Sequence, residues 1–283
     1  MRLWALFVAL FALVAQPAAA ASSPGLQGLE QQLSYLVAGT SADVGIAALD
    51  LKTGETVSIK GGTPFPMAST VKVAVAALYL AQVDHGRRSL DDTINGVSAR
   101  SLMSRMLVHS DNRATDILIK DLGGPKRINT WLHDNGLTGL RVDRTIAQLL
   151  ADKRDLWDRR DSSTPMAMVE LLNRIYKAQL ISPDSRNYLL DVMAQCATGR
   201  NRMKALLPSG TPVEHKTGTL NGYTSDVGFI TLPDGRRVAV AIFARGGANR
   251  PRTIAESARA IYDGFTRILT WPFSAPAAAS AGH

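Results

Sequence analysis

Cysteine is nearly absent from this 283-residue sequence, with Cys196 as its single occurrence. One cysteine cannot form an internal disulfide, and paired-thiol redox chemistry and cysteine-rich zinc modules are excluded with it. No Cys-His signature surrounds Cys196, so we interpret it as a small buried residue and not as a nucleophile. The sequence also shows no internal repeat.

Long apolar runs are scarce too, and the one candidate lies at the N-terminus. Residues 1–23 read MRLWALFVALFALVAQPAAAASS, with one arginine, an apolar stretch from Leu3 to Val14 and small residues near Ala20. The stretch is too short to span a bilayer and is typical of a secretory signal peptide, with a retained anchor as the alternative. We expect residues 1–21 to be removed and the mature protein to be periplasmic or secreted, without stable membrane insertion.

Positive charge is in excess, with a net charge of +8 that comes mostly from scattered arginines. The densest run, ADKRDLWDRRD, alternates aspartates with bases. This alternation indicates a solvated, ion-paired surface and not a nucleic-acid groove, so we expect no nucleic-acid partner.

The hydrophobic periodicity predicts strands at both ends of the chain. Residues 42–62 alternate as two strands around the turn LKTGE, and strands return over 211–220 and 224–247. A final amphipathic helix is predicted over 252–269. Helical patterns occupy the middle of the chain, at residues 99–110, 112–124, 125–136, 164–179 and 182–196.

This order predicts an α/β fold, with one sheet from both termini and an inserted all-helical lobe. We assign residues 22–65 and 208–272 to the α/β lobe, 66–207 to the helical lobe and 273–283 to a disordered tail. A functional site is expected in the crevice between the two lobes.

A further apolar helical pattern begins near Met67 and carries Ser69 and Lys72 one turn apart. Residues at i and i+3 share a helix face, so both side chains are predicted to point into one space. A lysine in an apolar run is desolvated, which favours its neutral form and makes it a possible base for the adjacent hydroxyl. A helix-capping serine with a lysine that extends to solvent is the alternative.

Two more short motifs follow in the sequence. Ser110-Asp111-Asn112 lies in a break between two helical patterns, and residues 216–219 (Lys-Thr-Gly-Thr) lie on a strand that leads into a hairpin. Each alone is compatible with a capping turn or an ordinary edge strand. All three motifs in this order, each in a suitable context, are improbable by chance.

Together the three motifs resemble the signature of the class A β-lactamase family, a branch of the penicillin-recognising serine enzymes. The resemblance covers nearly all of the mature chain, including WLHDNGLTGLRVDR before the omega loop, LPDGRRVAVAIFA and the C-terminal helix. It implies a β-lactamase/transpeptidase-like fold, a small-molecule β-lactam or peptidoglycan-like substrate, no cofactor, no metal and a monomer.

The resemblance also implies the catalytic roles. Ser69 attacks a strained amide, and Lys72 takes its proton when a second ammonium, from Lys216, lowers the pKa of Lys72. Ser110 passes a proton to the departing nitrogen.

Substrate-binding roles follow from the same resemblance. Asn112 bonds the side-chain amide of the substrate, and Thr217 and Thr219 of the strand that includes Gly218 offer hydroxyls to its carboxylate. The backbone N–H groups of Ser69 and Thr219 form the oxyanion hole.

One part of the family pattern is missing. The neck of the omega loop is present as Arg144 and Asp161, but Ile146 occupies the position of the glutamate that holds the hydrolytic water, and Leu150 that of its companion asparagine. Residues 143–161 contain no glutamate. Five residues are possible substitutes for this base: Asp152, Asp155, Asp158, Gln148 and Lys72. The alternative is that the aspartates only solvate an arginine-rich loop.

A second departure is the short connection between His85 and Ser110, where the family carries an aromatic gate. No tryptophan or tyrosine occurs between Tyr79 and Trp131, so the cleft is expected to be more open there. His109 and His215 flank two of the motifs, but no third metal ligand is identifiable, which favours packing roles for both.

The leading hypothesis is a β-lactamase-type serine hydrolase that is acylated at Ser69 and turns over slowly or selectively. A penicillin-binding D,D-peptidase that acts on peptidoglycan stem peptides is the alternative, favoured by the missing glutamate. An inactive binding protein for cell-wall fragments is a third hypothesis. The complete Ser-Lys-Ser-Lys set speaks against it, because binding alone needs no buried lysine beside a serine.

Overall fold

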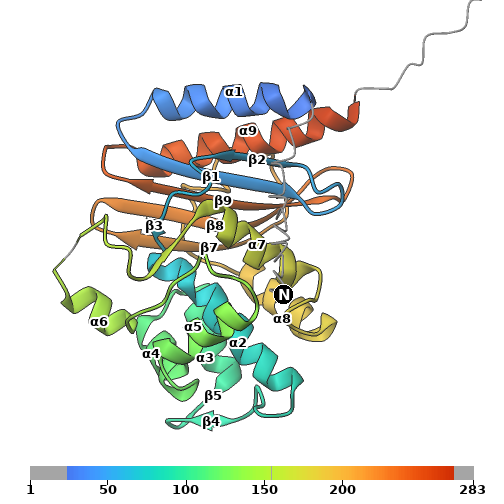
Figure 1. Cartoon of the computed structure of the whole chain (residues 1–283). Coiled ribbons are helices and arrows are strands. Elements are labelled where there is room, and N and C mark those ends of the chain that lie inside the picture. The colour runs from blue at the N-terminus through green and yellow to red at the C-terminus, as the bar shows by residue number, and fades with distance from the viewer. Residues whose placement is uncertain (1–23, 154, 271–283) are drawn as a thin grey trace, which may run out of the picture.

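A five-stranded antiparallel sheet forms the centre of the computed structural model, which describes residues 24–153 and 155–270 (Figure 1). Its strand order is β2-β1-β9-β8-β7. The strands are β1 (Asp43–Asp50), β2 (Thr56–Ile59), β7 (Val213–Leu220), β8 (Tyr223–Thr231) and β9 (Arg237–Arg245). The two ends of the chain therefore build one sheet, which confirms the predicted fold class.

Helices cover both faces of the sheet. On one face α1 (Pro24–Ala38) lies beside α9 (Arg250–Thr270), and on the other α7 (Pro165–Tyr176) contacts β1 and β9 (Figure 1). Strand β9 is consequently buried along almost its whole length. Burial on both faces explains why VAVAIFA reads as a continuous apolar run and does not alternate.

The helical lobe packs around α2 (Lys72–Asp84), in which every residue from Lys72 to Ala81 is buried. A helix that is apolar on all sides is stable only inside a protein. The 3₁₀ turn η1 (Ala68–Val71) precedes α2 and contacts β7 and β8, so the start of the central helix is held against the sheet. The remaining helices of the lobe are α3 (Ala99–Val108), α4 (Asn112–Asp121), α5 (Pro125–Asp134), α6 (Ile146–Ala151) and α8 (Pro183–Ala194).

Two short strand pairs complete the described chain. One joins β3 (Phe65–Pro66) to β6 (Ser162–Ser163), and the other is the hairpin of β4 (Thr93–Ile94) and β5 (Val97–Ser98). The pairing of β3 with β6 ties the segment before Ser69 to the end of the loop that carries Ile146.

The predicted strands and long helices are confirmed, whereas α1, α6 and the β4–β5 hairpin were not anticipated from the sequence. The predicted signal peptide (1–21) and tail (273–283) lie outside the described residues. Within residues 24–153 and 155–270, no helix is long and apolar enough to cross a membrane.

Close packing of β7 on β8 depends on Gly228. Gly228 pairs with His215, and a Cβ atom on it would lie 2.0 Å from the carbonyl oxygen of Glu214 and 2.6 Å from the Cα of His215. Its φ of +156° is also a conformation that other residues rarely adopt. Any side chain at this position would push β7 away from the sheet.

Gly228→Ala is expected to lower the free energy of unfolding by about 1–3 kcal/mol, the usual scale for an overpacked site. Urea-induced unfolding of the parent and the variant measures the difference. Gly28→Ala in α1 is the matched control, because a Cβ there meets nothing within 4 Å and alanine favours the helix. Equal stability of Gly228→Ala and the parent would contradict the role given to this glycine.

Candidate active site

Ser69 lies in η1, at the entrance to α2, and is half-buried between buried neighbours. Ala68, directly before it, has a φ of +49°, in the left-handed region that non-glycine residues rarely occupy. Such strain is typical of functional sites, where the surrounding structure holds the backbone in place. The helix predicted to begin near Met67 thus starts as a 3₁₀ turn at Ala68 and becomes an α-helix at Lys72.

The Lys72 ammonium is buried and makes three hydrogen bonds. Nζ donates to the carbonyl oxygen of Ser110 (2.7 Å), to Ser110 Oγ (3.1 Å) and to Asn112 Oδ1 (2.8 Å). Among the described residues, Ser69 Oγ has no hydrogen bond to Lys72. Helical spacing predicts that Ser69 and Lys72 point into one space, but residues of the second motif supply the acceptors that fix the orientation of Lys72.

Ser110 joins the two lysines of the site. Its Oγ accepts hydrogen bonds from Lys72 Nζ and from Lys216 Nζ, the latter at 2.9 Å. Like Ala68, Ser110 has a left-handed backbone, with a φ of +58°. A hydroxyl that accepts from two ammonium groups keeps its own proton free to donate. Ser110 is therefore arranged as a proton donor.

Burial shifts the protonation of both lysines, and neighbouring positive charges add to the shift. Burial, followed by the charge of Lys216, lowers the pKa of Lys72 to about 7. Burial also lowers the pKa of Lys216 to about 8. A lysine with a pKa near neutrality is partly unprotonated at physiological pH and is suited to act as a general base.

Gly218 allows β7 to approach η1. A Cβ at this position would lie 2.4 Å from Ser225 Oγ and 2.8 Å from the carbonyl oxygen of Met67. The absence of a side chain therefore brings the strand, with Thr219 exposed beyond it, against the turn that carries Ser69. Since β7 is an edge strand, alternate backbone N–H groups face away from β8.

Two side chains that the sequence reasoning missed hold this end of β7. Arg202 donates to the carbonyl oxygens of Gly218 (2.9 Å) and Ser225 (3.0 Å) and to Thr219 Oγ1 (2.7 Å). Thr198 Oγ1 lies 2.6 Å from Thr217 Oγ1. Both residues follow α8 in the sequence and belong to no motif. Their contact with β7 could therefore be found only from the three-dimensional structure. The Arg202 guanidinium adds a second positive group beside the threonine hydroxyls.

The side chain of His215, a residue of β7, lies beside Cys196. His215 Nδ1 is 2.8 Å from Asp226 Oδ1, and both side chains are fully buried. Burial opposes protonation of His215, but Asp226 and Cys196 raise its pKa to about 9. Cys196 Sγ lies 3.3 Å from Thr198 Oγ1, so the cysteine is buried, as expected, within a polar chain that reaches Thr217. No group of three His, Cys, Asp or Glu side chains in the described part of the chain is placed to hold a metal ion.

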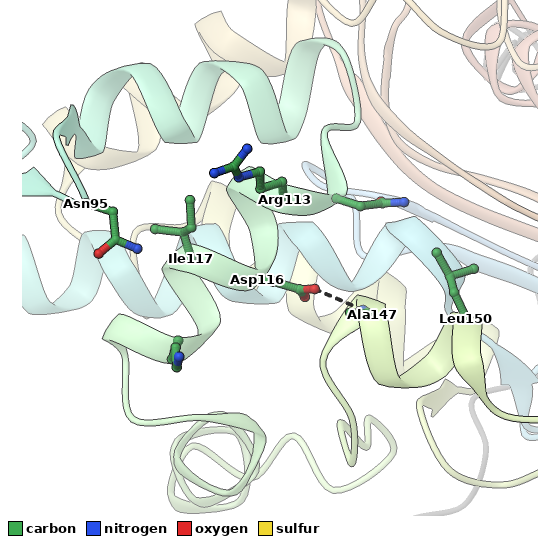
Figure 2. Close-up of a pocket in the computed structure, with 8 residues that line it drawn as sticks. Asn95, Arg113, Asp116, Ile117, Ala147 and Leu150 are labelled. Carbon is green, nitrogen blue, oxygen red and sulfur yellow. Dashed lines mark hydrogen bonds between the residues drawn. The ribbon is translucent and has the colours of Figure 1, made fainter.

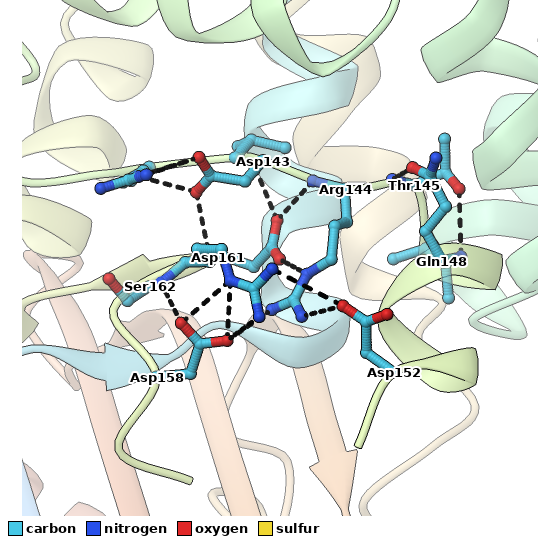
Figure 3. A network of polar contacts seen from close by, with 12 residues as sticks. Asp143, Arg144, Thr145, Gln148, Asp152, Asp158, Asp161 and Ser162 are labelled. Carbon is cyan, nitrogen blue, oxygen red and sulfur yellow. Dashed lines mark hydrogen bonds and ion pairs between the residues drawn. The ribbon is translucent and has the colours of Figure 1, made fainter. Parts of the chain in front are cut away.

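The predicted neck of the omega loop is confirmed (Figure 3). Arg144 Nε donates to Asp161 Oδ2 at 2.6 Å, and Asp161 Oδ1 accepts the backbone N–H groups of Asp143 and Arg144. The guanidinium of Arg144 also contacts Asp152 (2.7 Å) and Asp158 (3.3 Å). One largely buried arginine thus holds three carboxylates of the loop.

The loop residues considered as substitute bases are engaged within the loop itself. Asp152 and Asp158 pair with arginines, Arg160 among them. Asp155 accepts the backbone N–H of Trp157. Gln148 accepts the backbone N–H of Thr145 in a capping box at the start of α6. Of the five candidates, Lys72 alone lies among the motif residues.

Ile146 is buried at the first position of α6 and presents no carboxylate. Its backbone N–H donates to Asp116 Oδ1 (2.6 Å), and that of Ala147 donates to Asp116 Oδ2 (2.9 Å; Figure 2). Asp116 was not anticipated, although its i+4 spacing from Asn112 places both on one face of α4. This aspartate fixes the omega loop against the helix that carries Asn112.

Known proteins match the chain along most of its length. The sequence profile of the Beta-lactamase enzyme family matches residues 28–265. The extended-spectrum β-lactamase PER-1 of Pseudomonas aeruginosa is 32% identical over 267 residues, which cover 83% of this chain and 86% of PER-1.

Solved structures share the fold. A β-lactamase from Chitinophaga pinensis is 27% identical, with a TM-score of 0.79 over 84% of this chain and 99% of that chain. A variant of the last common ancestor of Gram-negative bacteria β-lactamase class A is 30% identical, with a TM-score of 0.80 over 85% and 99% of the two chains. The matched segment includes all three motifs and the omega loop. The chain therefore belongs to the class A β-lactamase family, and it is a serine β-lactamase-like hydrolase.

Proposed function

We propose that this protein opens β-lactam rings through an acyl-enzyme on Ser69 and that it releases the acyl group slowly. The convergence of two buried ammonium groups on Ser110 Oγ carries the first part of the proposal. The lack of a carboxylate at Ile146 carries the second. The names of the relatives, β-lactamases throughout, support the choice of substrate.

Acylation requires one proton to leave Ser69 and one to reach the departing nitrogen. Ser69 Oγ attacks the β-lactam carbonyl carbon, and neutral Lys72 accepts its proton. As the C–N bond breaks, Ser110 donates its hydroxyl proton to the nitrogen and recovers one from Lys72, whose Nζ lies 3.1 Å away. The proton of Ser69 thus ends on the nitrogen, and Lys72 returns to its neutral form.

The substrate is held from three sides in this proposal. The backbone N–H groups of Ser69 and Thr219 stabilise the oxyanion, and Asn112 bonds the side-chain amide. The charges of Lys216 and Arg202 attract the substrate carboxylate toward the hydroxyls of Thr217 and Thr219, which are bonded to Thr198 and Arg202 respectively.

Deacylation needs an activated water, and the omega loop supplies no base for it. The sec-butyl side chain of Ile146 offers an apolar surface and no proton acceptor, and the aspartates of the loop are bonded to arginines or to the backbone. Lys72 is the remaining titratable group among the motif residues. Its Nζ is already bonded to Ser110 and Asn112, so in this proposal it serves deacylation less well than a dedicated carboxylate and the second step is slow.

The missing base also favours a D,D-peptidase as a second candidate function. In that case the acyl group comes from a peptidoglycan stem peptide, and β-lactams act as inhibitors. Both candidates share the acylation chemistry and differ in the fate of the acyl-enzyme.

We further propose that the protein is exported to the periplasm or beyond and acts as a monomer. We also propose that it divides into two lobes, with boundaries at residues 65/66 and 207/208. The sequence of residues 1–23 supports export.

Covalent labelling by a fluorescent penicillin is expected to follow a bell-shaped pH dependence. The rate rises as Lys72 loses its proton near pH 7, because only neutral Lys72 accepts the proton of Ser69. It falls above about pH 8, as Lys216 loses the charge that attracts the substrate carboxylate. The apparent pKa values of the rising and falling parts of the profile belong to the coupled pair of lysines and not to either residue alone. Rapid-quench labelling between about pH 5 and about pH 10, roughly two units beyond these values on either side, measures the profile.

Ser69→Ala should abolish labelling while the fold is kept, and Lys72→Ala and Lys216→Ala should each slow it by at least about 100-fold. Labelling of Ser69→Ala at the parental rate, or a pH-independent parental rate, would remove these residues from the mechanism.

Ile146→Glu is expected to shorten the lifetime of the acyl-enzyme by about 10- to 1,000-fold, the usual contribution of a general base. Leu150→Asn in addition should help to hold the water. Single-turnover kinetics with benzylpenicillin measure the lifetime. Ile146→Gln is the matched control, since it adds a polar side chain of similar size without a carboxylate. A parental enzyme that deacylates rapidly would refute the claim that Ile146 limits turnover. So would equal lifetimes for the parent, Ile146→Glu and the double variant.

A further inference from the structure

Cys196 belongs to a row of three buried side chains, Cys196, His215 and Asp226. His215 Nδ1 is 2.8 Å from Asp226 Oδ1, and the Cys196 thiol lies beside the same imidazole ring. Since Nδ1 is bonded to Asp226, Nε2 is the ring nitrogen left to face the thiol. Nε2 is fully buried and has no hydrogen-bond partner among the described residues. An oxygen atom added to the sulfur would supply the partner that this nitrogen lacks.

The charges around this row favour a thiolate. Lys216 of β7 and Arg202, which follows α8, face Cys196 as positive groups, and Asp226 of β8 faces His215. Protonated His215 is a third positive group, so Asp226 and the thiolate of Cys196 together balance two of the three positive charges.

The protonation of Cys196 and His215 follows from these neighbours. Burial opposes ionisation of Cys196, but His215, Thr198 and Lys216 lower the pKa of its thiol to about 6. The raised pKa of His215, about 9, keeps its ring protonated at neutral pH. A thiolate beside an imidazolium is the arrangement that makes a cysteine reactive.

Cys196 is buried but lies directly beneath the surface. Its residue is 7% exposed, and Gln195 and Ala197 on either side are both exposed. Hydrogen peroxide is little larger than water, so it needs a smaller opening than a protein thiol or a bulky alkylating reagent. The reagent that suits this thiolate is therefore a small peroxide.

We propose that Cys196 is a modification site for small peroxides and that its oxidation to a sulfenic acid slows acylation of Ser69. With hydrogen peroxide as the oxidant, the thiolate attacks one oxygen, the S–O bond forms, the O–O bond breaks, and sulfur loses two electrons. The other oxygen leaves as hydroxide and takes the proton of the His215 imidazolium. The products are the sulfenic acid, neutral His215 and water.

The segment that contains Cys196 connects the sulfur to the active site. Cys196 Sγ lies 3.3 Å from Thr198 Oγ1, which lies 2.6 Å from Thr217 Oγ1. The N–H of Ala197 donates to the carbonyl oxygen of Val108 at 3.0 Å. An added oxygen at Sγ would displace this segment and with it the hydroxyl of Thr217. The modification site itself does not depend on the proposed function, whereas its effect on acylation rests on it.

Hydrogen peroxide followed by dimedone, which bonds to sulfenic acids and not to thiols, tests the modification by intact-mass spectrometry. The parent should gain one dimedone adduct, and Cys196→Ser should gain none, because Cys196 is the single cysteine. Dimedone also separates this reaction from oxidation of the eight methionines, which gain oxygen without forming a sulfenic acid. The rate of adduct formation should be half-maximal near pH 6, whereas an ordinary thiol gives about pH 8.5.

His215→Gln should slow adduct formation at about pH 7 by about 3- to 30-fold. The thiolate fraction falls by about 30-fold when the thiol pKa returns to its ordinary value, while the remaining thiolate is more nucleophilic. Glutamine keeps an amide that can donate to Asp226. His133→Gln, at an exposed position in α5, is the matched control and should react at the parental rate. If His215→Gln does not fold, the pH dependence of the parent decides.

Labelling by a fluorescent penicillin measures the effect on the active site. Peroxide should slow labelling of the parent by about 10- to 100-fold, the usual scale for a displaced active-site group. Dithiothreitol, which reduces a sulfenic acid but not methionine sulfoxide, should restore the rate. Cys196→Ser should keep its own untreated rate throughout.

Three outcomes would contradict different parts of the account. No dimedone adduct on the folded parent, or a rate half-maximal near the ordinary thiol value, would overturn the modification site. An adduct on Cys196 with unchanged labelling would overturn its effect on acylation. A parent that is oxidised at Cys196 but is never labelled, even without peroxide, would overturn the proposed function and the effect on acylation, and would leave the modification site standing.

Discussion

Two buried ammonium groups donate to one serine hydroxyl, and the chemistry that we propose for this protein depends on that arrangement. Lys72 and Lys216 lie 3.1 Å and 2.9 Å from Ser110 Oγ and are both fully buried. Burial and like-charge repulsion disfavour two protonated lysines side by side, so Lys72 has a pKa near neutrality. Burial, reinforced by the charge of Lys216, suits Lys72 to act as a base.

The rest of the fold keeps these groups from moving apart. The sheet built from both ends of the chain presents β7 at its edge, η1 packs against that edge, and α4 begins beside α2. Gly218 and Gly228 permit the close approach of β7, while Ala68 and Ser110 keep left-handed backbones next to the reacting groups. A fold that tolerates two such residues in one site holds the site rigidly.

The omega loop keeps the contacts that hold it in place but carries no carboxylate at Ile146. The Arg144–Asp161 pair and the contact of Asp116 with the start of α6 hold the loop in place. Ile146 nevertheless offers no proton acceptor. In the proposed function, acylation and deacylation depend on different elements of this fold, and only the second step is weakened.

The four residues that we propose as catalytic, Ser69, Lys72, Ser110 and Lys216, could be selected from the sequence because each belongs to a short motif in a recognisable local context. Periodicity likewise predicted the strands and the long helices. It missed α1 and the six-residue α6, which is short and starts with a capping box.

Contacts between distant segments were harder to predict. Arg202 and Thr198 are defined by their approach to β7 and not by any spacing. The orientation of Lys72 depends on an acceptor 38 residues away. Helical spacing alone could not show that the second motif, and not Ser69, fixes this ammonium.

Intact-mass spectrometry of the parental protein mixed with benzylpenicillin tests the central claim most directly. Ring opening adds the whole penicillin to the protein, so the account predicts one adduct of that mass, absent from Ser69→Ala, that persists from minutes to hours. Unmodified protein throughout, with the penicillin either untouched or hydrolysed within seconds, would contradict it.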